Sequence, residues 1–167
     1  MTRLRVLVAA LTFSASGLVA LTGYEWYTER AVIPVPGDVP TIGFGTTEGV
    51  KLGDRTTPPA ALARAHRDVQ KFEGALRTCV TAPLHQHEYD AYVSLAYNIG
   101  IGKSGVVDGF CYAKRGGYST LVTKLNALDY AGACKEILRW NRAQGRVVRG
   151  LTKRRQAEYA TCTGASQ

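Results

Sequence analysis

The stretch Thr57–Cys79, which reads TPPAALARAHRDVQKFEGALRTC, divides the chain in two. Thr57 can cap a helix, and the two prolines that follow suit a first helical turn. Apolar residues then recur at spacings of three and four, which predicts one long amphipathic helix that ends before Pro83. We expect this helix to join a small lobe to a larger one. Its apolar positions are Leu62, Ala65, Val69, Phe72, Leu76 and Cys79.

The two sides of this helix differ in pattern. Residues 24–59 are rich in Pro, Gly, Val and Thr, which predicts short strands with turns at Gly37-Asp38 and Gly43–Gly45. After Pro83 the pattern is helical. A helix marked by Tyr89–Tyr97 should end before Gly100, and residues 163–167 should form a frayed tail. Further helices are expected at 121–128, with Ser119 as a cap, at 133–138 and at 151–162.

Composition limits the class of protein and of partner. The 167 residues fit one domain with a real core, and the formal net charge of +8 favours an anionic partner. Because no nucleic-acid-binding motif accompanies the charge, we expect a cell-wall polymer or a membrane surface and no nucleic acid. The densest basic patch runs from Arg142 to Arg155.

The N-terminal segment has the pattern of a targeting sequence. Arg3 and Arg5 precede an apolar run without charges over residues 6–24. The run is marginal for a membrane span, since it contains several small polar residues. A cleaved signal peptide, a permanent anchor and a weakly held anchor that later leaves the bilayer all fit. The small polar residues favour the weakly held anchor.

Four cysteines lie after this segment, at positions 79, 111, 134 and 162. Their spacing is not that of a zinc site, and an exported protein meets an oxidising compartment. Two disulfides are therefore expected, with three possible connectivities.

Carboxylates are the remaining candidates for chemistry. The sequence has no serine-nucleophile elbow and no phosphate-binding glycine loop, and we expect no metal or other cofactor. The histidines at 66, 85 and 87 are interpreted as surface or helix-face residues. Five acids occupy the predicted small lobe, namely Glu25, Glu29, Asp38, Glu48 and Asp54. Glu25 directly follows the apolar run, and an apolar setting helps a glutamate keep its proton as a general acid.

Several stretches, taken in order, resemble one family of enzymes. Gly23-Tyr24-Glu25 precedes Pro40–Gly45, which reads PTIGFG, and Tyr89–Gly100 reads YDAYVSLAYNIG. Shorter motifs follow at Ser119–Leu121, Lys124–Asn126, Asp129–Cys134, Arg139-Trp140, Gly150-Leu151 and Arg154–Glu158. Over nearly the whole chain, from Gly23 to Cys162, this ordered set resembles the phage T4-type lysozymes, the endolysins of glycoside hydrolase family 24.

The resemblance implies an α+β lysozyme-like fold of two lobes. The small N-terminal lobe would hold short β-hairpins, and the long helix would join it to a larger all-helical C-terminal lobe. It also implies a monomeric muramidase, which hydrolyses the β-1,4 bonds between N-acetylmuramic acid and N-acetylglucosamine in peptidoglycan, with substrate between the lobes. A signal-anchor over residues 1–24, a lysozyme domain over 25–162 and a flexible tail over 163–167 are expected.

The catalytic set is only partly matched. In the family a glutamate acts as general acid, followed by an aspartate and then a threonine; Glu25 and Thr41 match the first and third members. The aspartate's position holds Pro34, and the nearest carboxylate is Asp38. Asp38 either takes over that role or is a turn residue that bonds its own backbone, in which case Glu25 works with Thr41 and water. Glu29 is an outside candidate.

The resemblance has three further implications. The leader is similar to that of signal-anchor-release endolysins, which are held in the host inner membrane and then released into the periplasm. The pairs Cys79–Cys111 and Cys134–Cys162 are preferred as staples of the large lobe. Thr46 stands where the family has a histidine, so the ion pair of that histidine is not expected. Two alternatives stay open: a lytic transglycosylase that needs only Glu25, and an inactive wall-binding protein.

Overall fold

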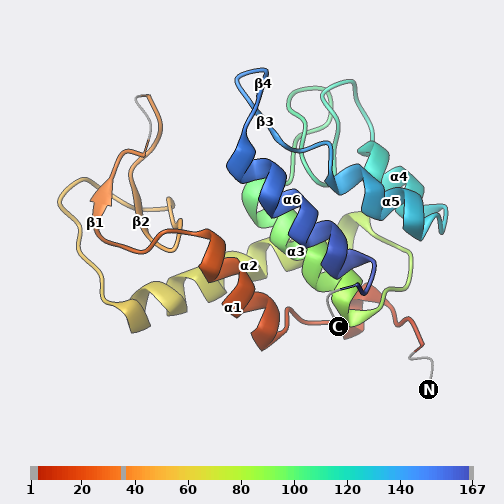
Figure 1. Cartoon of the computed structure of the whole chain (residues 1–167), viewed down its shortest axis with the longest axis horizontal. Coiled ribbons are helices and arrows are strands. Elements are labelled where there is room, and N and C mark those ends of the chain that lie inside the picture. The colour runs from red at the N-terminus through yellow and green to blue at the C-terminus, as the bar shows by residue number, and fades with distance from the viewer. Residues whose placement is uncertain (1–3, 35–36, 166–167) are drawn as a thin grey trace. The chain divides into compact units, whose positions relative to one another are not determined.

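Figure 1 shows a computed structural model of the chain, which describes residues 4–34 and 37–165. Within those ranges it has six α-helices, one short 3-10 helix and two antiparallel two-stranded sheets. This confirms the predicted mixture of helices and short hairpins. The chain forms two compact units: unit 1 is Met1–Ser14 with Phe72–Gln167, and unit 2 is Ala15–Lys71.

The long helix is present as predicted. It is α2 (Pro58–Cys79), and the division between the two units falls inside it. Ala65, Val69 and Leu76 are fully buried, in agreement with the predicted apolar face. The prediction that Leu62 belongs to the apolar face is wrong: 43% of its surface is exposed, and the neighbouring Ala61 is buried instead. The helix also ends at Cys79, earlier than Pro83 requires.

Unit 2 holds the predicted small sheet. Strand β1 (Thr28–Val32) pairs antiparallel with β2 (Thr41–Gly43), so that Thr28 faces Gly43 and Val32 faces Thr41. Helix α1 (Ala15–Tyr24) precedes β1, and three residues after β2 the chain pairs back with that strand in a bridge between Ile42 and Thr46. The sheet is therefore a hairpin. One end of it follows α1 closely, and at the other end residues 33–40 connect the two strands.

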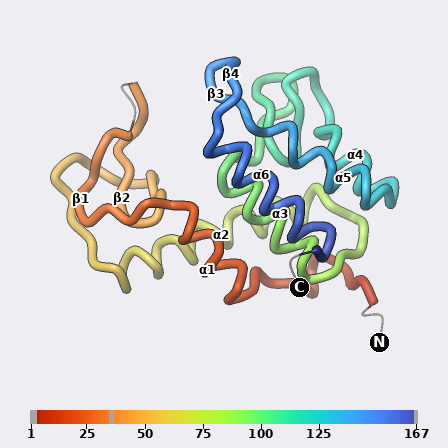
Figure 2. The backbone as a smooth tube through the Cα atoms, viewed as in Figure 1, coloured from red at the N-terminus to blue at the C-terminus, as the bar shows by residue number. Residues whose placement is uncertain are grey.

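Unit 1 is built from the four predicted helices. They are α3 (Gln86–Ile99), α4 (Thr120–Asn126), α5 (Tyr130–Ile137) and α6 (Arg149–Cys162). Helix α3 packs against α6, and α5 packs against both α4 and α6, as the tube in Figure 2 allows the reader to follow. Ser119 caps α4 as predicted, since its hydroxyl accepts a hydrogen bond from the backbone N–H of Val122 at 3.1 Å.

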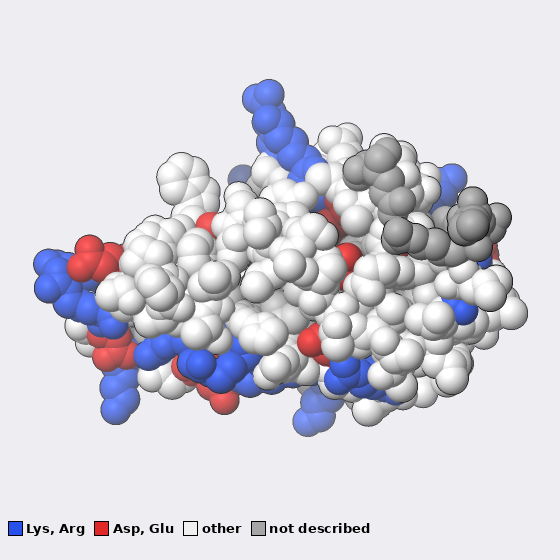
Figure 3. All heavy atoms as spheres, turned by 90° about the horizontal axis from the view of Figure 1, so that it is seen from below, with Lys and Arg blue, Asp and Glu red and all other residues white. Residues whose placement is uncertain are grey.

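A small hairpin lies inside the basic patch and is absent from the sequence-based prediction. Strands β3 (Arg142–Ala143) and β4 (Arg146–Val147) are two residues each and exposed. Gln144 and Gly145 both have positive φ, 49° and 77°, which is the backbone of a tight two-residue hairpin turn. On the face shown in Figure 3, Lys and Arg side chains stand in several separate places among acidic ones.

The leader is folded in pieces that belong to both units. Its described part forms a 3-10 helix, η1 (Val8–Ala10), and then α1. Val6 and Leu84 exchange two backbone hydrogen bonds of 2.9 and 2.7 Å, and Val8 and Leu11 are buried. Residues 5–14 are therefore joined to unit 1 by one isolated backbone bridge and by buried apolar side chains. Among the described residues, no helix has both the length and the apolar character needed to cross a membrane.

Two buried carboxylates hold the segment just before α1. The backbone N–H of Phe13 donates to Glu73 at 2.7 Å. Both the N–H and the hydroxyl of Ser14 donate to Asp90, at 3.0 and 2.6 Å. Because Glu73 and Asp90 are buried on α2 and α3, these bonds supply partners that a carboxylate away from water requires.

The histidines at the start of α3 are less exposed than the sequence suggests. His85 and His87 are both half-buried and their rings stack with centroids 5.3 Å apart. Burial lowers the pKa of His87, and the positive charge of Arg5 acts in the same direction. Arg5 of the leader bonds Glu88 at this end of α3, and Gly164 lies beside the ring of His87. His66 is exposed on α2.

The four cysteines form the two pairs that the resemblance implies. Cys79 is bonded to Cys111 and Cys134 to Cys162, each with Cα atoms 5.8 Å apart. The first pair joins the end of α2 to the loop before α4, and the second joins α5 to α6. Both therefore lie within unit 1.

A buried charge network joins α3 to α6. Glu158, only 2% exposed, accepts hydrogen bonds from the hydroxyl of Ser94 at 2.8 Å, from Nε of Arg154 at 3.1 Å and from Nη2 of Arg155 at 3.0 Å. Arg155 is fully buried. A carboxylate removed from this network would leave buried positive charge without its counter-ion.

We therefore predict that Glu158→Gln lowers the free energy of unfolding by about 3 kcal/mol, since one partner of a buried ion pair is lost. Urea denaturation followed by circular dichroism measures this. The matched control is Glu29→Gln, whose ion pair with Arg55 is largely exposed and should change stability by less than about 1 kcal/mol. Equal losses in the two variants would contradict the prediction.

Candidate active site

Glu25 lies at the end of α1, where the chain leaves the helix. It is half-buried and its side chain reaches the turn after β2. A Cβ built on Gly45 would lie 3.1 Å from Oε2 of Glu25 and 3.4 Å from its Cδ. The carboxylate therefore lies against the backbone of Gly45, and a side chain at position 45 would push it away by a few tenths of an ångström.

The turn that carries Gly45 is tight and well bonded. Ile42 and Thr46 exchange backbone hydrogen bonds of 2.9 and 3.1 Å, which closes the loop over Gly43–Gly45. Gly43 and Gly45 have φ of 65° and 84°, a region that side chains with a Cβ rarely adopt. The predicted turn at these glycines is thus observed, and it brings the backbone of Gly45 close to Glu25.

The residues after Glu25 are fixed to the same turn. The hydroxyl of Tyr27 donates to the backbone oxygen of Thr56 at 3.2 Å, and its ring packs on Phe44 with centroids 5.4 Å apart. Trp26, between Glu25 and Tyr27, is 91% exposed. The chain on either side of Trp26 is therefore held while its indole projects into solvent.

The other two predicted catalytic residues lie further along the hairpin. Thr41 opens β2 opposite Val32, two residues, or about 7 Å, along the strand from Gly43. Its hydroxyl donates to the backbone oxygen of Val39 at 3.2 Å. Asp38 is exposed in the connection between β1 and β2, and its carboxylate accepts a bond from the N–H of Val39 at 2.8 Å. That bond is the local backbone contact expected of a turn aspartate.

Thr46 has a specific partner that the sequence did not reveal. Its side chain is buried and donates to Oδ2 of Asp68, on α2, at 2.7 Å. At the position where the family has a histidine, this chain therefore has a neutral hydroxyl. It forms a hydrogen bond and, as expected, no ion pair. The only trace of this contact in the sequence is that an acid on the long helix, Asp68, follows Thr46 by 22 residues.

The remaining acids of unit 2 have surface roles. Glu29 pairs with Arg55, Glu48 pairs with Lys71, and Asp54 accepts a bond from the backbone N–H of Lys51 at 2.9 Å. Each is exposed or lies in a turn. Of the five candidate carboxylates, Glu25 alone lies against the glycine turn.

A separate hollow of about 660 Å³ is present in unit 1. It is lined by charged and aromatic side chains that include Lys114, Arg139 and Trp140. None of Glu25, Asp38 and Thr41 lines it. The candidate acid of the reaction therefore does not belong to this hollow.

The close contact of Gly45 with Glu25 gives a testable prediction. Gly45→Ala should lower turnover of the reaction that Glu25 supports by about 10- to 100-fold, because a displaced catalytic group is costly. The added Cβ would also strain the backbone by about 1–2 kcal/mol. Activity on the substrate and urea denaturation separate the two effects.

Gly49→Ala is the matched control. Its φ is 70°, so the strain is similar, but nothing lies within 4 Å of its added Cβ. We expect the same loss of stability with activity retained. Loss of activity in both variants to the same degree would show that Gly45 acts only through stability.

Comparison with known proteins places this chain in a family. Residues 24–158 match the family described as phage lysozyme. The chain is 36% identical to the endolysin of Acyrthosiphon pisum secondary endosymbiont phage 1, over 88% of this chain and 94% of the relative. It is 33% identical to the SAR-endolysin of Pseudomonas phage phiKMV, over 92% of this chain and 88% of that protein.

Solved structures agree. The endolysin from Escherichia coli O157:H7 phage FAHEc1 aligns with a TM-score of 0.75 and 29% sequence identity, covering 93% of this chain and 96% of its own. The predicted lysozyme-like fold is therefore confirmed. With a matching family and close relatives over most of its length, the chain belongs to the phage lysozyme family.

Proposed function

We propose that this protein is a phage endolysin, a muramidase that hydrolyses the β-1,4 bonds between N-acetylmuramic acid and N-acetylglucosamine in peptidoglycan during host lysis. The observation that carries the proposal is the carboxylate of Glu25 held against the Gly43–Gly45 turn. Membership of the phage lysozyme family supports the reaction class. The net charge of +8 suits an anionic wall polymer.

Glu25 is the general acid in this proposal. It protonates the glycosidic oxygen as the bond to the sugar breaks, and the developing positive charge on the ring is then met by a nucleophile. Gly45 lets the glycan approach Glu25 without a side chain in the way.

Thr41 orients the attacking water in the hydrolytic version of the reaction. Its hydroxyl already donates to a backbone oxygen, so its lone pairs can accept a hydrogen bond from the water. Asp38 would serve as the second carboxylate only if the connection between β1 and β2 brings it to the sugar. Hydrolysis leaves a reducing end on the released sugar.

A lytic transglycosylase is the second candidate, because Asp38 does not stand at the position of the family's second catalytic carboxylate. The position nine residues after Glu25 holds Pro34, and Asp38 is exposed and bonded to its own neighbour's backbone. A single carboxylic acid can suffice when the substrate's own hydroxyl attacks. The product then has an anhydro-sugar end in place of a reducing end.

The test is turnover of purified peptidoglycan by the wild type, Glu25→Gln and Asp38→Asn, with mass analysis of the new sugar ends. We expect Glu25→Gln to lose at least about 100-fold in rate, because proton donation is removed. Loss in both variants with reducing ends indicates a hydrolase that uses both acids. Loss in Glu25→Gln alone leaves Asp38 as a turn residue, and the sugar ends decide between the two reactions.

Two variants of the same unit serve as controls. Glu48→Gln removes an exposed glutamate, and Asp54→Asn removes another aspartate that accepts a backbone N–H in a turn. Both should keep wild-type turnover. Full activity of Glu25→Gln, or equal losses in these controls, would contradict the assignment of Glu25.

For location, we infer that the leader first anchors the protein in the host inner membrane and that the protein later acts in the periplasm. As one helix, residues 6–24 would extend about 28 Å, close to the thickness of a bilayer's hydrocarbon core. The basic residues Arg3 and Arg5 precede them, as at a cytoplasmic flank. Similarity to a protein named SAR-endolysin supports the same route.

The prediction is that full-length protein sediments with host membranes and becomes soluble and periplasmic after a proton ionophore collapses the membrane potential. Intact-mass measurement of both fractions should give the same uncleaved chain. A shortened soluble form would indicate a cleaved signal peptide. Protein that stays in the membrane after depolarisation would indicate a permanent anchor.

A further inference from the structure

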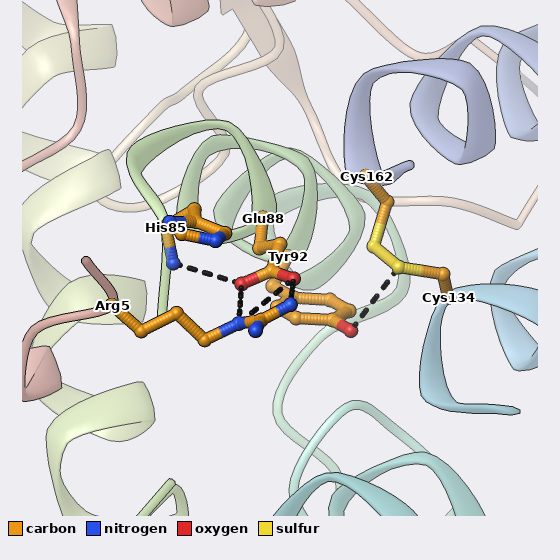
Figure 4. A network of polar contacts seen from close by, with 6 residues as sticks. All are labelled: Arg5, His85, Glu88, Tyr92, Cys134 and Cys162. Carbon is orange, nitrogen blue, oxygen red and sulfur yellow. Dashed lines mark hydrogen bonds and ion pairs between the residues drawn. A yellow bond between two sulfur atoms is a disulfide. The ribbon is translucent and has the colours of Figure 1, made fainter. Parts of the chain in front are cut away.

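Arg5 of the leader is held in a specific site on unit 1. Its Nη2 lies 2.7 Å from Oε1 of Glu88 and its Nε lies 3.0 Å from Oε2, a two-pronged contact with one carboxylate (Figure 4). The guanidinium carbon also lies 3.7 Å from the centre of the Tyr130 ring. A planar cation that bonds a carboxylate with two nitrogens and stacks on an aromatic face is a geometry that arginine provides and lysine does not.

The site is built from matching faces of two helices. Glu88 and Tyr92 are four residues apart on α3, and Tyr130 and Cys134 are four apart on α5. Residues at that spacing share one face of a helix. The two faces meet where the hydroxyl of Tyr92 lies 3.6 Å from Sγ of Cys134. Glu88 and Tyr130 lie one turn away on the same two helix faces, and Arg5 contacts both of them.

The start of α3 holds the carboxylate of Glu88 in place. Its Oε2 accepts a bond of 2.8 Å from the backbone N–H of His85, at the start of α3. The Glu88 side chain is only 4% exposed, whereas that of Arg5 is 33% exposed. Without Arg5, this buried carboxylate would lose its positive partner.

The disulfide between Cys134 and Cys162 fixes one of these two faces. It bonds α5 to α6, and α6 packs against α3. The position of Tyr130 opposite Glu88 thus depends on a covalent link one turn away on α5. The other bridge, Cys79–Cys111, has neither of its cysteines on α3, α5 or α6.

We propose that Glu88, Tyr92 and Tyr130 form a guanidinium-binding socket for Arg5, and that the Cys134–Cys162 disulfide shapes this socket, so that the leader docks stably on unit 1 only after that bridge has formed. The docking is independent of the proposed enzymatic function. Its timing relative to export rests on the proposed route to the periplasm.

Oxidation is the controlling step. Closing the bridge removes two protons and two electrons from the thiols of Cys134 and Cys162, and an exchanging protein disulfide accepts them and becomes a dithiol. Such oxidants act in the periplasm and are opposed in the cytosol. A chain still in the cytosol would therefore have an incomplete socket and an undocked leader.

Hydrogen exchange of the full-length oxidised protein, read by mass spectrometry, tests the proposal. The peptide over residues 4–14 reports docking, because the N–H of Val6 is bonded to Leu84. We expect Arg5→Gln to accelerate exchange of this peptide at least about tenfold and Arg5→Lys to accelerate it less, since the lysine keeps the charge and loses the fork. Arg146→Gln, on exposed β4, should leave it unchanged. Wild-type protection in Arg5→Gln would overturn the socket.

The disulfide is tested by two matched double variants. Cys134→Ala/Cys162→Ala should release the peptide over residues 4–14, while Cys79→Ala/Cys111→Ala should keep it protected. Peptides from α3 and α6 in the same samples show whether unit 1 is still folded. Retained protection in the first variant, or equal loss in both, would overturn the link between this bridge and docking.

If Cys134→Ala/Cys162→Ala does not fold, Tyr92→Phe and Tyr130→Leu replace it. Tyr92→Phe removes only the hydroxyl that meets Cys134, and Tyr130→Leu removes the aromatic face under Arg5. Faster exchange of residues 4–14 in both, with α3 and α6 protected, supports the socket. Unchanged exchange in both would contradict it.

Discussion

Carboxylates buried on helices α2 and α3 are the constraint on which the N-terminal fold depends. Glu73, Glu88 and Asp90 are all shielded from water, and a shielded carboxylate is costly unless it is hydrogen-bonded or paired. Each has one partner on α3 or at its start, namely the hydroxyl of Tyr89 for Glu73, the N–H of His85 for Glu88 and the amide of Gln86 for Asp90. The leader adds a guanidinium for Glu88, and backbone N–H groups of residues 13 and 14 for the other two. The leader is thereby bonded at several points, while only a few of its apolar side chains are buried.

This dependence explains what could be read from the sequence and what could not. The helix α2 was predictable because its apolar spacing is local, and the cap at Ser119 was predictable because it concerns residues three apart. The fold of the leader was not, since its anchors pair residues 83 and 76 positions apart. An apolar run without charges has no pattern that distinguishes a membrane span from a segment lying on a protein surface.

In the candidate site, too, local features could be predicted from the sequence and long-range contacts could not. Glu25 and the glycine turn could be identified, because a glutamate after an apolar run and glycines in a turn are local features. The depth of Thr46 and its bond to Asp68 on α2 could not, because they arise when the turn packs on a distant helix. Asp38 could be named only as a candidate, and its bond to the adjacent N–H gives the turn interpretation a physical basis. The hairpin at Gln144-Gly145 was missed because two-residue strands carry almost no periodicity.

The composition of the leader has a reason in the folded protein. Ser14 weakens the apolar run as a membrane span, yet its hydroxyl makes a 2.6 Å bond to Asp90. The backbone oxygen of Thr12 accepts a bond from the side chain of Gln86 at 2.8 Å. A strongly apolar run would favour the bilayer more and would offer Asp90 one partner fewer. In the proposed route, the residue that makes the anchor marginal also stabilises the docked state, so weak insertion and firm docking follow from one choice of side chain.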